Sequence, residues 1–423
     1  MQKVVIIASI VSTQLALTLG TQILIIRLSG LGRLSDAYFA AQASALVISA
    51  IIISLLQAIW IHRLSNASEN LATRLISLAT AQGQAFLIAA TTLGVIILSS
   101  NLWMEAVFPG FDDEQITSLR TFSLIFFFAS LFNILSSILI TGLRSQDRFF
   151  TPELIALGGS IFSLVAILTF AGSFNLEFAA VVFLGKSIIQ YLTLLYANNW
   201  PRISLKDGAL HARNWATLGK MSWGPSIQKT SPLIDRYFAS MAGAGGLTML
   251  NFSQTAMGAV SLVLERALCT PLIPGLSRSA YNGEYRNLYK TLRTCISYIL
   301  IISIALVAAL IILRPSAITA LGVLFMLDDS ASAVLWSTTM LLFGYVFSAA
   351  AGAVVVATFH AIGDFYTPLL VGLLGFAVGI PIKMYLFNFF GISGLAAGIS
   401  AYYLMNMLLM SIILERKIRS RFS

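Results

Sequence analysis

Long apolar runs, interrupted at intervals by short charged or turn-rich stretches, are the main pattern of this chain. A helix that crosses a membrane needs about 20 apolar residues, because every backbone amide must find its hydrogen-bond partner within the segment. We therefore predict an all-α polytopic membrane protein with about twelve transmembrane helices. They lie near residues 4–27, 36–61, 75–99, 119–141, 152–171, 177–198, 219–241, 248–271, 293–313, 333–358, 367–388 and 391–414.

A short motif occurs twice, each time directly before an apolar run. Phe149–Pro152 reads FFTP and Phe365–Pro368 reads FYTP. Threonine favours the position that caps a helix and proline favours its first turn, so we expect both copies to start helices in this way at the inner surface. A displacement of 212 positions also superimposes Gln42 on Gln254 and Ser49 on Ser261. These matches indicate an internal duplication.

The duplication predicts two lobes of six helices each. We place an N-terminal lobe at residues 1–199, a cytoplasmic linker at 200–218 and a C-terminal lobe at 219–423. Because each lobe holds an even number of helices, both lobes run in the same sense and form a parallel repeat. Membrane transporters built from such repeats hold their substrate near the repeat interface, so the duplication favours a transporter.

Charged residues set the expected orientation. Lysine and arginine accumulate in cytoplasmic loops of membrane proteins. With both termini cytoplasmic, the inner segments hold 17 basic residues and the outer segments hold 4. The chain is 58% hydrophobic and 10% charged, which leaves too little polar surface for a soluble globule. The net charge of +9 follows largely from the basic inner loops, and bases spread over separate loops argue against a nucleic-acid partner.

Several charged residues lie inside the predicted spans, where a charge usually faces a bundle interior or a wet cavity. Lys229 is about ten residues into its helix, roughly 15 Å deep, and is our first candidate for contact with a substrate. Lys186 is at a similar depth in helix 177–198. Asp235 and Arg236 lie near the outer surface, either at a site or as an interfacial pair. Lys383 lies near the outer end of helix 367–388, where we expect its ammonium group to reach the interface.

Uncharged polar residues form a stripe on the eighth predicted helix. Steps of three and four place them on one helical face, which we expect to line a central cleft together with Gln42 of the second helix. Hydrogen bonding between helices is the equally open alternative. The stripe consists of Asn251, Gln254, Gly258, Ser261 and Glu265.

The sequence offers little for catalysis. His62, His211 and His360 lie in separate inner loops without metal-ligand spacing, and no Walker-type phosphate loop is present. We therefore expect no enzyme, no cofactor and no metal site, and a transporter driven by another gradient. The alternative from a different class is a membrane glycosyltransferase or polymerase. It would need a large outer loop with clustered carboxylates, which the sequence lacks.

Four segments resemble a known family. Leu31–Ala41 (LGRLSDAYFAA), Phe108–Phe111 (FPGF), Ile234–Ser240 (IDRYFAS) and Leu272–Ser277 (LIPGLS) are similar to segments of the MurJ (MviN) lipid II flippases. That family belongs to the superfamily of multidrug, oligosaccharidyl-lipid and polysaccharide exporters. The resemblance implies two six-helix lobes around a V-shaped central cavity, in the bacterial plasma (inner) membrane.

The resemblance also implies a function. It suggests flipping of a polyprenyl-(pyro)phosphate-linked oligosaccharide to the outer leaflet, by a monomer that works beside glycan-assembly enzymes in the lipid bilayer. The functionally important aspartate of the family's second helix maps to Asp36. The cations left to meet a pyrophosphate are Lys229, Arg236 and Lys186.

Two departures from the family point away from lipid II as the cargo. Leu15, Thr21, Ser49 and Thr255 stand where the family has cavity arginines, and two C-terminal helices are missing. The runner-up is a cation-coupled small-molecule exporter of the same superfamily. It would use Asp36, Asp235 or Glu265 as its coupling carboxylate.

Overall fold

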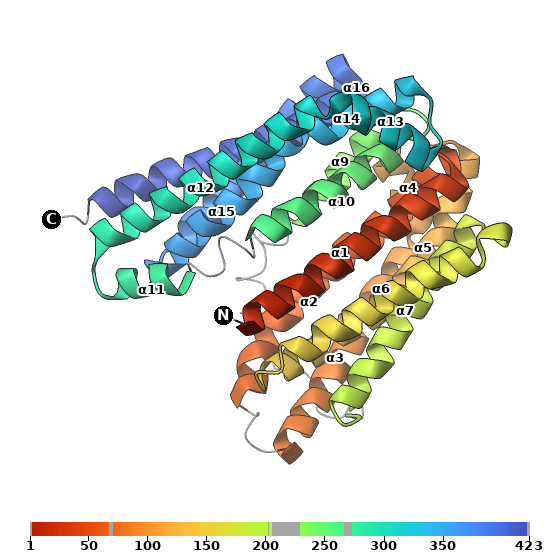
Figure 1. Ribbon diagram of the computed structural model, residues 1–423. Helices are drawn as coiled ribbons and strands as arrows, with labels where there is room; N and C mark the ends of the chain where they lie inside the picture. Colours follow the sequence, from red (N-terminus) through yellow and green to blue (C-terminus); the bar gives the residue numbers. More distant parts are fainter. Residues whose placement is uncertain (1, 67–70, 202, 205–228, 266–272, 421–423) are drawn as a thin grey trace. The chain divides into compact units, whose positions relative to one another are not determined.

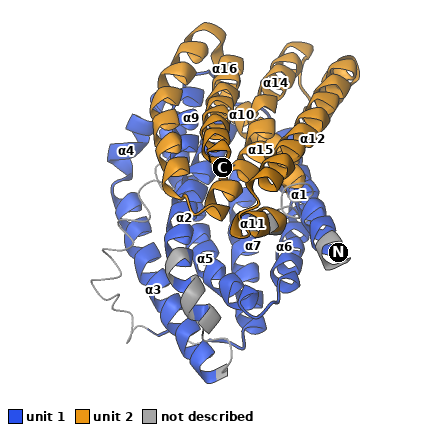
Figure 2. Cartoon of the chain, turned by 90° about the vertical axis from the view of Figure 1, so that its left-hand side faces the viewer, with its two compact units in different colours: residues 1–245 blue, residues 246–423 orange. Residues whose placement is uncertain are grey.

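The computed structural model describes residues 2–66, 71–201, 203–204, 229–265 and 273–420 (Figure 1). Throughout these residues the chain is helical apart from short turns, and none of them forms a strand. The backbone separates into two compact units, Met1–Gly245 and Gly246–Ser423 (Figure 2). The lobe limits expected from the sequence remain a prediction, because compactness is a different criterion from internal duplication.

Unit 1 is built around α5, which contacts α2, α3 and α7, while α1 packs against α6. Aromatic rings join these helices: Tyr38 lies edge-on to Phe122 and Phe126, and Phe126 in turn contacts Phe183, with ring centroids 5.2 to 5.7 Å apart. Such edge-to-face pairs stabilise a core beyond the area they bury. The described helices of this unit are α1 (Gln2–Ser29), α2 (Arg33–Asn66), α3 (Leu71–Leu98), α4 (Ser100–Val107), α5 (Asp113–Arg144), α6 (Phe150–Thr169), α7 (Leu176–Ala197) and α9 (Ser231–Ser240), with a 3-10 turn at Ala171–Ser173.

Unit 2 has a separate core in which α12, α15 and α16 lie side by side (Figure 1). Leu288, Ile299, Val354 and Leu414 are fully buried there. The described helices are α10 (Gly246–Leu264), α11 (Ile273–Tyr281), α12 (Tyr285–Ile312), α13 (Arg314–Phe325), α14 (Asp329–Leu341), α15 (Phe343–Ala361) and α16 (Tyr366–Arg419).

The long α16 is a hairpin of two helical limbs. The chain reverses at Gly391, whose φ of 58° and ψ of −138° lie outside the helical region. Small residues let the limbs meet: a Cβ on Gly379 would overlap the ring of Tyr402, and one on Gly398 would lie 2.9 Å from the Cα of Lys383. Small residues such as glycine are a common way for membrane helices to approach closely. The hairpin therefore provides the two separate spans predicted at 367–388 and 391–414.

The predicted spans agree with the helices of the structure. Ten helices in the described parts of the chain are long and apolar enough to cross a membrane, with α16 counted once and α14 joined to α15. Division of α16 at Gly391 adds one more span. Of the predicted helix 219–241, the structure describes residues 229–241. Twelve transmembrane helices therefore fit the architecture.

Helix boundaries recur between the two halves at a constant spacing. Positions 113 and 329, where α5 and α14 begin, differ by 216, as do 150 and 366, where α6 and α16 begin. Asp112 caps α5 by accepting from Gln115 N at 2.8 Å, and Asp328 caps α14 by accepting from Ala331 N at 2.9 Å. These caps are also 216 positions apart, so the duplication extends to the capping of α5 and α14.

Packing recurs with the same spacing. A Cβ on Gly159 would overlap the side chain of Gln190, and a Cβ on Gly375 would overlap that of Asn406. Gly375 is 216 positions after Gly159, and Asn406 is 216 positions after Gln190. The fifth and sixth helices of each half thus meet through a glycine that faces an amide side chain.

The expected capping role of the repeated Thr-Pro motif is wrong. The helices begin at Phe150 and Tyr366, one residue before the threonine, so proline is the third helical residue in both copies. In the second copy the N-cap residue is Phe365, and Asp364 before it accepts hydrogen bonds from Thr367 N at 3.0 Å and Thr367 Oγ1 at 2.7 Å. A carboxylate is a stronger acceptor than a hydroxyl, so Asp364 serves the free helix N–H in place of the threonine.

The expected interfacial position of Lys383 is also wrong. The residue is only 2% exposed, and its ammonium group lies 4.9 Å from the centroid of the Tyr402 ring. The close approach of Gly398 brings the second limb of α16 over the lysine and prevents it from reaching the surface. A cation–π contact of this kind partly replaces the water that the ammonium group loses.

Candidate functional site

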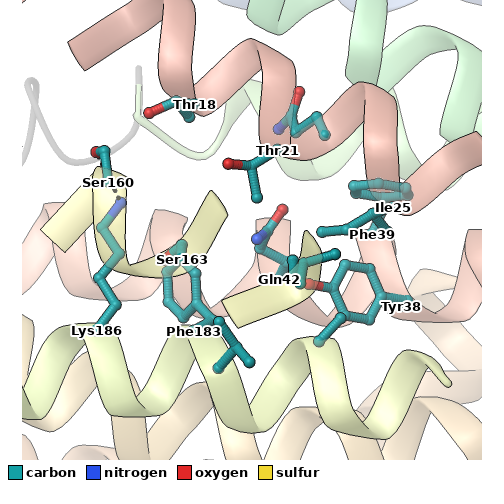
Figure 3. A pocket seen from close by; sticks show the side chains of 14 residues that line it. Thr18, Thr21, Ile25, Tyr38, Phe39, Gln42, Ser160, Ser163, Phe183 and Lys186 are labelled. Carbon is teal, nitrogen blue, oxygen red and sulfur yellow. Dashed lines mark hydrogen bonds between the residues drawn. The ribbon is translucent and has the colours of Figure 1, made fainter. Parts of the chain in front are cut away.

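A cavity of about 60 Å³ lies inside unit 1, between α1, α2, α6 and α7. Figure 3 shows Thr21, Gln42 and Lys186 projecting toward it from different helices. One water molecule needs about 10 to 15 Å³ of such space, so the cavity has room for several. Its lining residues are Thr18, Thr21, Gln22, Ile25, Tyr38, Phe39, Gln42, Ser160, Ser163, Ile167, Ala179, Val182, Phe183 and Lys186.

Lys186 is the single cation that lines this cavity, and none of the lining residues is a carboxylate. Its Nζ donates one long hydrogen bond, 3.4 Å, to Ser160 Oγ (Figure 3). An ammonium group has three N–H donors, so two of them find no protein acceptor among the described residues. Lys186 is therefore a partly buried charge without a counter-ion among the residues that line the cavity.

The hydroxyl groups of the cavity wall are oriented by their own helices. Thr18 and Thr21 of α1 and Ser160 and Ser163 of α6 each donate to a main-chain carbonyl four residues earlier, at 2.8 to 3.2 Å. Their lone pairs are left to accept hydrogen bonds from the cavity side. The wall is therefore suited to solvate the ammonium group, directly at Ser160 and through water elsewhere.

The cavity unites two residues that the sequence analysis selected separately, Lys186 and Gln42. Sequence reasoning missed Ser160 and Ser163, although their spacing of three residues places both on one face of α6. Thr21 also lines the cavity, at a position where the resemblance places an arginine. The positive charge in this part of the protein thus comes from α7.

Lys229 lies elsewhere in unit 1. Its Nζ donates to the main-chain carbonyl of Ala50, in the middle of α2, at 3.1 Å. The side chain is partly buried. The hydrogen bond therefore ties Lys229, two residues before α9, to a neutral group of α2, and this contact leaves its positive charge uncompensated.

Asp36 and Asp235, the residues predicted to couple or gate transport, are both buried in unit 1. Asp36, in the first turn of α2, is 2% exposed, and its Oδ2 accepts a hydrogen bond from Gly245 N at 2.7 Å. Asp235 and Arg236 of α9 are 4% and 5% exposed, so they are buried and are not a solvated interfacial pair. Asp36 thus holds the turn after α9, and a charged pair lies within that helix.

The remaining candidates belong to unit 2. Asn251 and Ser261 of α10 are buried, while Gln254 and Glu265 are partly buried. A Cβ on Gly258, in the middle of the predicted stripe, would lie 3.8 Å from the hydroxyl of Tyr345 on α15. The stripe therefore lies close to α15 at Gly258, within unit 2.

Known membrane transport proteins share this architecture. The family model described as "Lipid II flippase MurJ" matches residues 30–423. No curated protein matches the chain. A solved structure of the lipid II flippase MurJ in an inward closed conformation has a TM-score of 0.83 at 14% identity, over 97% of this chain and 87% of that one.

Two multidrug transporters share the fold as well. An inward-facing transporter of the MATE family, in the MOP superfamily, has a TM-score of 0.78 at 15% identity, over 96% of this chain and 95% of that one. A point mutant of the Vibrio cholerae MATE transporter VcmN has a TM-score of 0.66 at 14% identity, over 100% of this chain and 98% of that one. Because the family model extends over nearly the whole chain, the protein belongs to the MurJ lipid II flippase family.

Proposed function

We propose that this protein moves a polyprenyl-(pyro)phosphate-linked oligosaccharide from the inner to the outer leaflet of the bacterial plasma membrane. The cargo would serve the synthesis of a cell-surface polysaccharide or the cell wall. The two lobes would rock about a central cavity and expose it to each side in turn. The protein would act as a monomer with cytoplasmic termini, beside the enzymes that assemble the glycan.

The observation that carries this proposal is the match of the MurJ family model to residues 30–423. Family members act on lipid-linked cargo in the bilayer. The twelve-helix architecture and the recurring helix starts in the two halves support a mechanism based on two similar lobes.

Buried cations give the proposal its chemistry. A pyrophosphate carries negative charge at the pH of the cell, and charge-assisted hydrogen bonds from lysine or arginine would hold it. Lys229 is the first candidate, because its hydrogen bond is to the neutral Ala50 carbonyl and its charge remains available. Arg236 is buried in α9, which begins two residues after Lys229. Lys186 lies in a cavity of about 60 Å³, too small for a saccharide.

The function and the residue are tested separately. Deletion of the gene followed by mass spectrometry of polyprenyl-linked lipids should show one accumulating species, which would identify the cargo. A lipid profile that does not change would refute the proposed function.

The variant Lys229→Ala should cause the same accumulation at unchanged protein level, because its ammonium group would no longer meet the phosphate. Lys290→Ala is the matched control, since Lys290 is an exposed lysine in α12. Normal export with Lys229→Ala would reject this residue as a cargo contact and leave the function itself untouched.

A second candidate is export of a small molecule coupled to a cation, favoured by the TM-score of 0.78 to a MATE transporter. Asp36, Asp235 or Glu265 would then bind the coupling ion. Overexpression should confer drug resistance in this case. Unchanged drug sensitivity, together with accumulation of a lipid-linked saccharide in the deletion strain, would reject the exporter.

A further inference from the structure

We propose that the Lys186 cavity of unit 1 binds a small inorganic anion of about the size of chloride, held by Lys186 Nζ and the side-chain amide of Gln42. Both side chains line the cavity (Figure 3). The site is distinct from the cargo path proposed above, and it would neutralise a charge that the protein leaves inside the membrane.

Lys186 has no counter-ion among the residues that line the cavity. Lys186 makes one hydrogen bond, to the neutral Ser160 hydroxyl, and the 14 lining residues include no carboxylate. An uncompensated charge at membrane depth is unfavourable, and proteins usually pair it. Since this part of unit 1 supplies no negative group, a mobile anion is the partner that fits the charge.

Gln42 brings a second hydrogen-bond donor to the cavity. Within the described residues, the side chain of Gln42 makes no hydrogen bond to protein, although its amide carries two N–H donors. The amide and the ammonium group thus offer hydrogen-bond donors to the same small space. The hydroxyl groups of Thr18 and Ser163 donate to their own helices, so the donors for the anion are the ammonium group and the amide.

The second copy of the duplication compensates its buried lysine in a different way. Tyr402 is 216 positions beyond Lys186, and Lys383 is 216 positions beyond Ile167, another lining residue of the cavity. In unit 2 the lysine lies against the tyrosine ring, 4.9 Å from its centroid. The same place in the fold therefore holds a lysine stacked on an aromatic ring in unit 2 and an open cavity beside a lysine in unit 1.

The size of the cavity restricts the ligand. About 60 Å³ admits a halide with water, but not a sugar, a gluconate ion or a lipid headgroup. Chloride is therefore the probe and gluconate is the anion that should fail to enter.

The test is thermal unfolding of the purified full-length protein in detergent, with chloride replacing gluconate at constant ionic strength. A ligand that binds only the folded state raises the melting temperature in a saturable manner. We expect this rise for the wild type, and we expect it to be absent from Lys186→Met. Gln42→Leu should require roughly tenfold more chloride for half of the effect, as expected for the loss of about one hydrogen bond.

Two further variants distinguish loss of the anion site from general misfolding. Lys186→Arg keeps the charge and should keep the chloride dependence. Lys383→Met removes the buried lysine of the second copy and should lower the melting temperature without loss of that dependence.

A melting temperature of the wild type that does not respond to chloride would overturn the proposal. So would a Lys186→Met protein with the wild-type half-saturating concentration, or a response to pH alone, which would make the proton the ligand. None of these readouts measures transport, so they are independent of the cargo experiment.

Discussion

Replacing Asp36 with alanine should loosen the turn that follows α9. Asp36 Oδ2 accepts from Gly245 N at 2.7 Å, and both residues are buried. Gly245 has a φ of +85°, and a Cβ on it would lie 3.1 Å from Leu31 Cβ, so the turn is packed closely against the segment before α2. The aspartate also lies in the first turn of α2, where the helix dipole favours a negative charge.

The size of the effect follows from the hydrogen bond. Alanine would leave the Gly245 N–H buried without this acceptor, which costs about 2 kcal/mol within a usual range of roughly 1 to 3 kcal/mol. Since about 1.4 kcal/mol corresponds to a factor of ten, the opening equilibrium of the turn should rise about 30-fold. Asp36→Asn keeps an oxygen that can accept but loses the charge, so about 1 kcal/mol, or roughly fivefold, is expected.

Hydrogen–deuterium exchange measures this opening directly, because amide exchange reports local free energies. Peptides that cover 241–247 should exchange faster in Asp36→Ala, less so in Asp36→Asn, and at the wild-type rate in Asp113→Ala. Asp113 is an aspartate in the first turn of α5 and serves as the control for loss of charge. Wild-type exchange in Asp36→Ala would refute the reasoning, and equal acceleration in α16 would show a global rather than a local effect.

Three further predictions concern stability. Gly398→Ala should destabilise the α16 hairpin by about 1 to 3 kcal/mol in thermal unfolding, because its Cβ would meet the backbone of Lys383. Gly352→Ala is the control: a Cβ there would have nothing within 4 Å, so the variant should be neutral or stabilising. Burial raises the pKa of Asp364, but hydrogen bonds from Lys417 and Thr367 outweigh it and lower this pKa from 3.8 to about 2. The lowered pKa stabilises the folded state above about pH 4, and this stabilisation is lost as the pH falls toward 2. Lys417→Met should reduce the stabilisation by less than about 1 kcal/mol, because the ion pair is partly exposed. Acid titrations followed by circular dichroism would measure the difference. Gln82 is hydrogen-bonded to Leu135 O at 2.7 Å and to the Tyr191 hydroxyl at 3.2 Å. Gln82→Leu would remove the partner of both groups and should lower the melting temperature. An unchanged melting temperature would contradict this prediction.

Hydropathy predicted the spans well because membrane thickness sets their length. The hairpin limbs expected at 367–388 and 391–414 meet at Gly391, within the usual uncertainty of a boundary. The short helices α4, α11 and α13, of 8, 9 and 12 residues, escaped this reasoning, because a search for runs of about 20 apolar residues does not detect them.

The site was harder to predict than the spans. The depth of Lys186 follows from its position in the sequence, but its neighbours depend on how α7 is rotated and which helices flank it. A hydropathy profile gives neither the rotation of α7 nor its neighbours. The structure was therefore needed to show that Lys186, Gln42 and Ser160 line the same cavity. The error at Lys383 has the same origin, because the aromatic ring and the glycine that cover it come from the other limb of the hairpin.

The constant spacing of 216 positions has an evolutionary consequence. From Asp112 to Asn175, and from Asp328 to Gly391, neither copy has gained or lost a residue relative to the other, although most of the paired side chains differ. One residue inserted in a helix rotates every later position by about 100°, which would misdirect a whole packed face. Insertions and deletions were therefore removed more strictly than substitutions. Within that fixed frame the copies diverged, and each came to bury a lysine between its fifth and sixth helices, Lys186 on the sixth and Lys383 on the fifth.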